Sequence, residues 1–127
     1  MEKSEKIYVA WSTGLVGWAI VKRLQNEGYT NIITRTRHEL DLTDKQAVNV
    51  FYTSIQPEYV IISAAKVGGI KANMTYPADF LYENLEIQNN LIWWAHLAWV
   101  KKLLFLWSSC IYPRECPQPM KEEYLMT

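Results

Sequence analysis

The chain has 127 residues, a length that suits one domain with a substantial buried core. Its 13 basic and 13 acidic residues give a formal net charge of zero, with no basic stripe to attract nucleic acid. The longest strongly apolar run, residues 103–107, is far too short to span a membrane, and the charged start does not resemble a secretory signal, so we expect a cytoplasmic protein.

Four short apolar runs predict β-strands, at residues 6–10, 31–34, 59–64 and 103–107. They lack strict alternation, which is typical of parallel strands covered on both faces. Helical patterns separate them, at residues 15–27, 44–54 and 78–99, with Gly28 as a stop and Thr43 or Asp44 as the second N-cap. The alternation predicts the α/β class: one three-layer Rossmann-type domain over residues 1–127, with a four- to five-strand parallel sheet in the order 3-2-1-4 or close to it.

Residues 7–18 run from an apolar strand into a helix and outline a dinucleotide-binding turn. The cofactor-binding positions that we predict on this turn are Trp11, Gly14, Leu15, Val16 and Gly17. Tryptophan stands where such turns carry their first glycine. If the backbone there has positive φ, Trp11 costs roughly 1–2 kcal/mol in strain. Its ring is expected in the groove where the pyrophosphate would lie.

Three longer strings are specific enough to name a family. Residues 63–70 (SAAKVGGI), 73–80 (NMTYPADF) and 103–113 (LLFLWSSCIYP) closely resemble GDP-L-fucose synthase, an extended short-chain dehydrogenase/reductase. The resemblance implies an NADPH-dependent epimerase and reductase of GDP-4-keto-6-deoxy-mannose. It covers essentially this whole chain but only the N-terminal part of such an enzyme, so we interpret the chain as truncated.

Carried over position by position, the resemblance implies further functional residues. Additional cofactor contacts fall on Arg35, Arg37, Asp41, Leu42, Ala64, Ala65, Lys66 and Trp107. Arginine after the second strand fits a 2′-phosphate, hence NADP. Ser108 matches the family's catalytic serine, and Cys110 a cysteine implicated in epimerisation. The family's Tyr-x-x-x-Lys pair would follow residue 127, so we expect no native catalysis and no NADP bound to this chain.

We interpret the chain as an engineered NADP-binding-type scaffold whose cofactor cleft is filled or lined by tryptophan. Trp11, Trp18 and Trp107 are expected to converge there. Two alternatives stay open: a binding module for a flat aromatic ligand or residual NADP(H), and an enzyme. The enzyme would be either an oxidoreductase/epimerase of the family type or a designed hydrolase that pairs Cys110 with His96.

The long helix at 78–99 carries the remaining tryptophans. Its main apolar stripe predicts a sheet-facing side with Trp94 and Trp99 in the core, whereas Trp93 falls on another face. We therefore hypothesise a homodimer through this helix. The remaining polar groups have plainer interpretations. Asp79, Glu83 and Glu86 are interpreted as a solvated helix exterior and His38 as an exposed turn residue, while Cys110 and Cys116 fit no zinc site, so we predict no metal.

Overall fold

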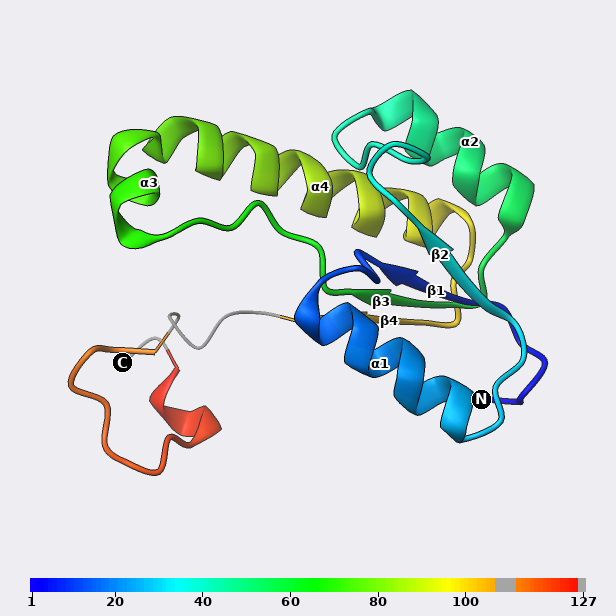
Figure 1. Ribbon diagram of the computed structural model, residues 1–127, viewed down its shortest axis with the longest axis horizontal. Helices are drawn as coiled ribbons and strands as arrows, with labels where there is room; N and C mark the ends of the chain where they lie inside the picture. Colours follow the sequence, from blue (N-terminus) through cyan, green and yellow to red (C-terminus); the bar gives the residue numbers. More distant parts are fainter. Residues whose placement is uncertain (107–111, 126–127) are drawn as a thin grey trace.

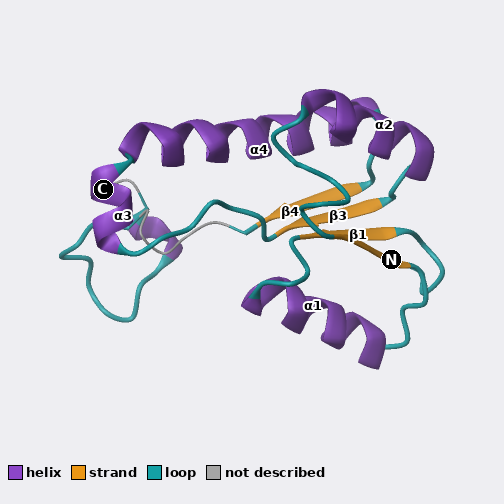
Figure 2. Cartoon of the chain, turned by 45° about the horizontal axis from the view of Figure 1, so that its top comes forward, coloured by secondary structure: helices purple, strands orange, loops and turns teal. Residues whose placement is uncertain are grey.

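The computed structural model describes residues 1–106 and 112–125 of the chain. It has three layers, with a parallel sheet between helix α1 on one face and helices α2 and α4 on the other (Figures 1 and 2). The strands are β1 (Ile7–Ala10), β2 (Ile32–Arg35), β3 (Tyr59–Ile62) and β4 (Lys102–Phe105). The helices are α1 (Leu15–Asn26), α2 (Lys45–Ile55), α3 (Ile70–Thr75), α4 (Pro77–Leu97) and the 3-10 turn η2 (Glu122–Tyr124). The predicted α/β class and four-strand parallel sheet are confirmed, while the sequence pattern gave no sign of α3.

The strand order is β2-β1-β3-β4, so the predicted order 3-2-1-4 is wrong. A right-handed crossover through α1 places β2 on one side of β1. The next crossover, through α2, runs in the opposite direction and therefore covers the opposite face, which places β3 on the other side of β1 (Figure 1). The direction of the chain thus reverses between β1 and β3, and ligands of open parallel sheets bind at such a reversal, outside the carboxyl ends of the strands.

Helix ends follow their predicted chemistry. The Asp44 carboxylate caps α2 by accepting hydrogen bonds from the backbone N–H groups of Gln46 (2.9 Å) and Ala47 (3.0 Å). Gly28, with φ of 82°, closes α1 by donating its N–H to the carbonyl of Gln25 at 2.9 Å. Both helix ends can be predicted from local sequence, since each needs only one residue type at one position.

The main core lies between the sheet and the pair α2 and α4. Alternate residues of the central strands, including Tyr8 and Ile62, are buried on this side. Tyr52 of α2 is fully buried and donates its hydroxyl to the carbonyl of Leu91 on α4 at 3.1 Å, which fixes the two helices to one another. Burial of this extent is the main source of stability for the domain.

Tryptophan placement departs from the sequence predictions at two positions. Trp94 packs against the core as expected, but Trp99 is 88% exposed, because α4 ends at Leu97 and the chain turns away. Trp18 is 56% exposed on α1 and does not reach the cleft. Within the described ranges, no helix is long and apolar enough to cross a membrane.

Candidate functional site

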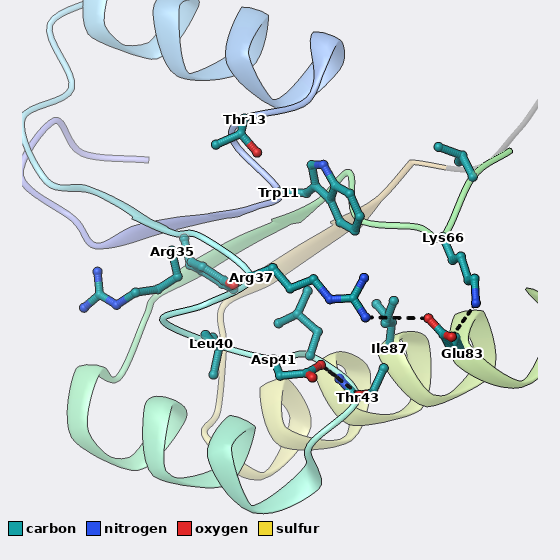
Figure 3. A pocket seen from close by; sticks show the side chains of 13 residues that line it. Trp11, Thr13, Arg35, Arg37, Leu40, Asp41, Thr43, Lys66, Glu83 and Ile87 are labelled. Atoms are coloured by element: carbon teal, nitrogen blue, oxygen red, sulfur yellow. Dashed lines mark hydrogen bonds and ion pairs between the residues drawn. The ribbon is translucent and has the colours of Figure 1, made fainter.

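A cavity of about 380 Å³ opens at the carboxyl ends of the strands, beside the β1–β3 reversal (Figure 3). Its walls come from β1, the last residue of β2, the segments that follow β1, β2 and β3, and α4. The lining residues are Tyr8, Trp11, Thr13, Arg35, Arg37, Leu40, Asp41, Leu42, Thr43, Lys66, Val67, Glu83 and Ile87. A pocket of this volume with apolar walls and a few convergent charged groups is typical of a small-molecule site.

Trp11 forms the corner between the cavity and the start of α1. It has φ of 64°, in the left-handed region, as its place in the glycine-type turn predicts. Its carbonyl accepts a hydrogen bond from the N–H of Gly14 at 3.3 Å. A Cβ added at Gly14 would lie 3.0 Å from indole atom Cδ1, so the ring packs directly on the turn that precedes the helix.

The helix that follows begins without a side-chain cap. Gly14 is its N-cap, and its first turn contains no acidic residue. Leu15 is 88% exposed and Val16 51% exposed. The N-terminus of a helix carries partial positive charge and N–H groups suited to an anion. The turn therefore has the electrostatics of a phosphate site, with the indole of Trp11 standing beside it.

Ser63, the first residue after β3, fixes the end of β1. Its hydroxyl donates to the carbonyl of Ala10 at 2.7 Å. Ala64 is buried and Ala65 half-buried in the segment that follows, and neither lines the cavity. The two alanines therefore do not present side chains to a ligand in the cavity.

The cations of the site come from two separate segments. Arg37 follows β2 and points into the cavity, whereas the Arg35 guanidinium points away from it, lying 5.8 Å from the ring of Phe51 and donating to the carbonyl of Thr34 at 2.7 Å (Figure 3). Lys66 enters from the segment after β3. Arg37 and Lys66 thus form the positive side of the cavity.

Glu83 of α4 faces these cations. Its Oε1 pairs with Lys66 Nζ, and its Oε2 lies 3.8 Å from Arg37 Nη2 (Figure 3). Its side chain is 28% exposed. The predicted role of Glu83 in a solvated helix exterior is therefore wrong: the residue lines the cavity, because the first half of α4 runs beside the segment after β3.

A short loop, residues 41–43, closes the side of the cavity next to α2 and α4. The Asp41 carboxylate accepts hydrogen bonds from the N–H (2.9 Å) and the hydroxyl (2.8 Å) of Thr43. These bonds, the backbone one first, lower the pKa of Asp41, so its carboxyl group stays ionised to a lower pH than usual. Buried Asn90 of α4 donates its amide to the carbonyls of Leu42 (2.9 Å) and Thr43 (3.2 Å), which holds the loop against the helix.

The structure therefore brings together about half of the predicted cofactor positions. Those that line the cavity are Trp11, Arg35, Arg37, Asp41, Leu42 and Lys66. Gly14 is the N-cap of α1 and Leu15, Val16 and Gly17 are its first three residues, and none of the four lines the cavity. Trp107, Ser108 and Cys110 lie outside the described residues, as does any approach of Cys110 to His96, which is exposed on α4 beside Trp93.

Sequence reasoning missed several cavity residues. They are Tyr8, Thr13, Leu40, Thr43, Val67, Glu83 and Ile87. Most of these are apolar or lie on strands and helices. The sequence alone does not tell whether such a side chain faces the core or a ligand, because this depends on how the elements pack. His38 is exposed, as predicted. Among the described residues, no three His, Cys, Asp or Glu side chains gather where they could hold a metal ion.

The chain was compared with sequence models of protein families, and the one for the NAD dependent epimerase/dehydratase family matches residues 7–127. This chain belongs to that family. Membership accounts for the parallel sheet, the turn after β1 and the cavity at the β1–β3 reversal, all of which are features of a dinucleotide fold.

Individual members of the epimerase/dehydratase family are similar over the full chain. GDP-L-fucose synthase 1 of Arabidopsis thaliana is 56% identical over 126 residues, which are 99% of this chain and 39% of the relative. GDP-L-fucose synthase of Escherichia coli is 48% identical over 122 residues, which are 96% of this chain and 38% of the relative. The chain thus spans about two fifths of the length of the curated relatives it matches.

Two solved structures are also similar to the chain over nearly its whole length. GDP-mannoheptose C4 reductase from Campylobacter jejuni, with NADP bound, superposes with a TM-score of 0.92 at 46% identity, covering 99% of this chain and 40% of that one. A GDP-L-fucose synthetase from Naegleria fowleri bound to NADP has a TM-score of 0.85 at 29% identity, covering 99% of this chain and 41% of that one. NADP is thus bound in both of these structures.

The residues of this family member fit one half of NADP better than the other. Arg37 and Lys66 offer cations for a ribose phosphate, and Leu42 and Ile87 offer apolar walls for a base. The diphosphate would lie on the turn at the start of α1. There the indole of Trp11 is packed on Gly14, so the ring stands beside the turn where such folds bind the diphosphate.

Proposed function

We propose that this chain is the dinucleotide-binding half of a GDP-sugar epimerase/reductase of the GDP-L-fucose synthase type, altered at its diphosphate turn by Trp11. The similarity to GDP-L-fucose synthases over 96–99% of the chain supports the assignment of type. The single observation that carries the altered turn is the indole on Gly14, at the edge of a cavity that is otherwise open.

The two halves of NADP meet different surroundings in this chain. The 2′-phosphoadenosine half enters the cavity, with its base between apolar walls and its phosphate near Arg37. When bound, NADPH would supply a hydride for reduction at its nicotinamide end. Here the diphosphate that joins the halves meets the ring of Trp11, so the chain binds the mononucleotide half in preference to the intact coenzyme.

Catalysis is not part of the proposed function of these 127 residues. Ser108 and Cys110 keep the residue types that the family resemblance assigns to the reaction. A coenzyme that is excluded from its diphosphate site is not positioned for hydride transfer, because the reacting atoms must be held about 3–3.5 Å apart. An engineered origin of the tryptophans remains our hypothesis, and the proposed function does not depend on it.

A second candidate function is binding of a planar aromatic molecule other than a nucleotide. The observation that favours it is the Trp11 ring, which lines the cavity opposite apolar side chains such as Leu40. Offset stacking on an indole contributes roughly 0.5–1.5 kcal/mol beyond area burial. An uncharged planar ligand that binds more tightly than adenosine 2′-monophosphate would favour this candidate over the first.

Calorimetric titration with NADPH and with adenosine 2′-monophosphate tests the main proposal. We expect the wild-type chain to bind the monophosphate at least as tightly as NADPH. Trp11→Gly removes the ring and should strengthen NADPH binding by at least about tenfold, which corresponds to about 1.4 kcal/mol, while leaving the monophosphate little changed. Trp99→Gly is the matched control, since Trp99 also has positive φ but lines no part of this cavity. Equal, tight NADPH binding by wild type and Trp11→Gly would refute the proposal.

A further inference from the structure

Glu83 is shared by two cations that come from different loops, and its meaning for a ligand rests on the proposed function of the cavity. Lys66 contacts Oε1, and Arg37 lies 3.8 Å from Oε2 (Figure 3). The carboxylate therefore stands where an anionic ligand group would have to stand to meet both cations at once.

The two cations differ in how firmly they are held. The backbone of Lys66 is fixed by Asn84, whose amide oxygen accepts from the Lys66 N–H at 2.7 Å and whose amide nitrogen donates to the Lys66 carbonyl at 3.0 Å. The Arg37 side chain is 64% exposed and meets Glu83 only at the outer limit of an ion pair. Lys66 thus extends from a fixed backbone and contacts Glu83 directly, whereas the exposed side chain of Arg37 can turn to a new partner at small cost.

The other charges at the cavity do not substitute for Glu83. The Asp41 carboxylate is already held by two hydrogen bonds from Thr43. Arg35 points away and lies over the ring of Phe51. Asp41 keeps its negative charge and acts on Arg37 electrostatically, so the local balance is two cations and two carboxylates. Of these two carboxylates, Glu83 is the one that forms ion pairs with the cations, and it lies among the groups that a ribose phosphate would use.

We propose that Glu83 is an internal competitor of the ligand phosphate: it occupies Arg37 and Lys66 and thereby sets how strongly the cavity distinguishes a phosphorylated ribose from an unphosphorylated one. A phosphate of nearly two negative charges binds by drawing Arg37 away from Glu83, and it does so against the repulsion of the remaining carboxylate. Glu83 is thus a specificity-determining residue that acts through its charge, without itself binding the nucleotide.

Removing the charge while keeping the shape tests this role. In Glu83→Gln the amide can still accept a hydrogen bond from Lys66, but it neither neutralises the cations nor repels a phosphate. A full charge a few ångströms from the phosphate in a largely solvated site is expected to change the affinity about three- to tenfold. The matched control is Glu86→Gln, three residues further along α4, since Glu86 does not line the cavity.

Two measurements are made on each protein. Binding of inorganic phosphate is followed as the rise in melting temperature relative to chloride of equal ionic strength. The affinities for adenosine 2′-monophosphate and for adenosine are compared by calorimetry. Glu83→Gln should increase the stabilisation by phosphate and raise the monophosphate-to-adenosine affinity ratio about three- to tenfold, while Glu86→Gln changes neither. Adding Arg37→Gln to Glu83→Gln should abolish both gains. Circular dichroism checks that each variant is folded.

The outcomes separate this inference from the proposed function. If no nucleotide binds any variant but Glu83→Gln gains affinity for inorganic phosphate, the proposed function falls and the role of Glu83 stands. If Glu83→Gln shows no gain for inorganic phosphate, or weakens both adenosine and its monophosphate equally, Glu83 only positions Lys66 and the inference is overturned.

Discussion

The carbonyl group of Trp11 lies against Gly17, so closely that a Cβ added at Gly17 would be 2.9 Å from the carbonyl carbon of Trp11 and 2.8 Å from Ser63 Oγ. Gly17 is buried one turn into α1. The end of β1, the start of α1 and the end of β3 therefore meet at this one residue. Gly17, the third position of the glycine pattern, is thus explained by the packing of the helix on the strands. Trp11 replaces the glycine of the first position but keeps the left-handed backbone conformation of that position.

Gly17→Ala should destabilise the domain. The added methyl collides with backbone atoms of Trp11, which cannot move without shifting β1 or α1, and overpacking of this kind costs about 1–3 kcal/mol. Urea unfolding followed by circular dichroism measures the loss. Gly69→Ala is the control, since a Cβ there meets nothing within 4 Å and a loss well under 1 kcal/mol is expected. Equal losses at both glycines would show that the contact with Trp11 is not the cause.

The end of α4 repeats the end of α1 with tryptophan in place of glycine. In α1, Gly28 donates to the carbonyl of Gln25 and Tyr29 to that of Leu24. In α4, the corresponding donations run from Trp99 to His96 at 3.1 Å and from Val100 to Ala95 at 3.0 Å. Both helices thus end in the same left-handed turn, at φ of 82° for the glycine and 55° for the tryptophan.

Trp99→Gly should therefore stabilise the protein by about 0.5–1 kcal/mol. Glycine relieves the strain of a left-handed residue with a side chain, about 1–2 kcal/mol. It also raises the conformational entropy of the unfolded chain, which offsets part of that gain. Little burial is lost, because Trp99 is 88% exposed. Trp18→Gly, at an exposed position within α1, should instead destabilise by roughly 0.5–1 kcal/mol. The paired unfolding free energies check both signs, and a loss of stability in Trp99→Gly would contradict the argument.

Much of the fold was predictable because it depends on local chemistry. Apolar runs indicated the strands, and Asp44 and Gly28 indicated helix ends, since capping needs only one residue type at one place. The strand order was not predictable in the same way. An apolar run does not say on which side of β1 it pairs, and only the direction of the α2 crossover decided that β3 lies there.

Site residues were predictable where they belong to a sequence motif or follow a strand, and not elsewhere. Trp11 and Arg37 follow strand ends, so their place at the carboxyl edge of the sheet could be inferred from position alone. Glu83 could not, since a glutamate on a helix is usually solvated, and its pairing with Lys66 joins residues 17 apart in sequence through the packing of α4. Charge pairs formed by tertiary structure leave no periodic signal.

Stability should depend on pH through an ion-pair cluster at the opposite end of the sheet. Lys101 Nζ contacts Glu5 at 2.5 Å and Glu58 at 2.7 Å. The hydrogen bond from Lys101 is the main cause that lowers the pKa of both carboxyl groups. A lowered pKa contributes stability that is present above the ordinary value of about 4.5 and is lost as the pH falls through the folded value.

The corresponding shift of Lys101 acts at the alkaline end. Its hydrogen bonds to the two glutamates raise its pKa, so its contribution to stability is complete below the ordinary value of about 10.5 and is lost as the pH rises through the folded value.

Lys101→Met removes the hydrogen bonds that lower the pKa of Glu5 and Glu58. It should therefore flatten the fall in unfolding free energy between pH 7 and pH 3.5. Lys102→Met, a neighbouring exposed lysine outside the ion pairs of the described residues, should leave that slope unchanged. Equal slopes in wild type and Lys101→Met would contradict the assignment.

The outer face of α4 predicts self-association of the chain. Apolar side chains on this face remain exposed, at Leu81, Leu85, Ile92, Trp93 and Leu97. Exposed apolar side chains gathered along one helix favour an interaction site, and we propose that this face pairs with the same face of a second copy. Sedimentation equilibrium should give twice the monomer mass for wild type and the monomer mass for Trp93→Glu. Trp18→Glu, a similarly exposed tryptophan on the opposite side of the sheet, should remain dimeric. A monomeric wild-type chain at every concentration tested would rule out the dimer.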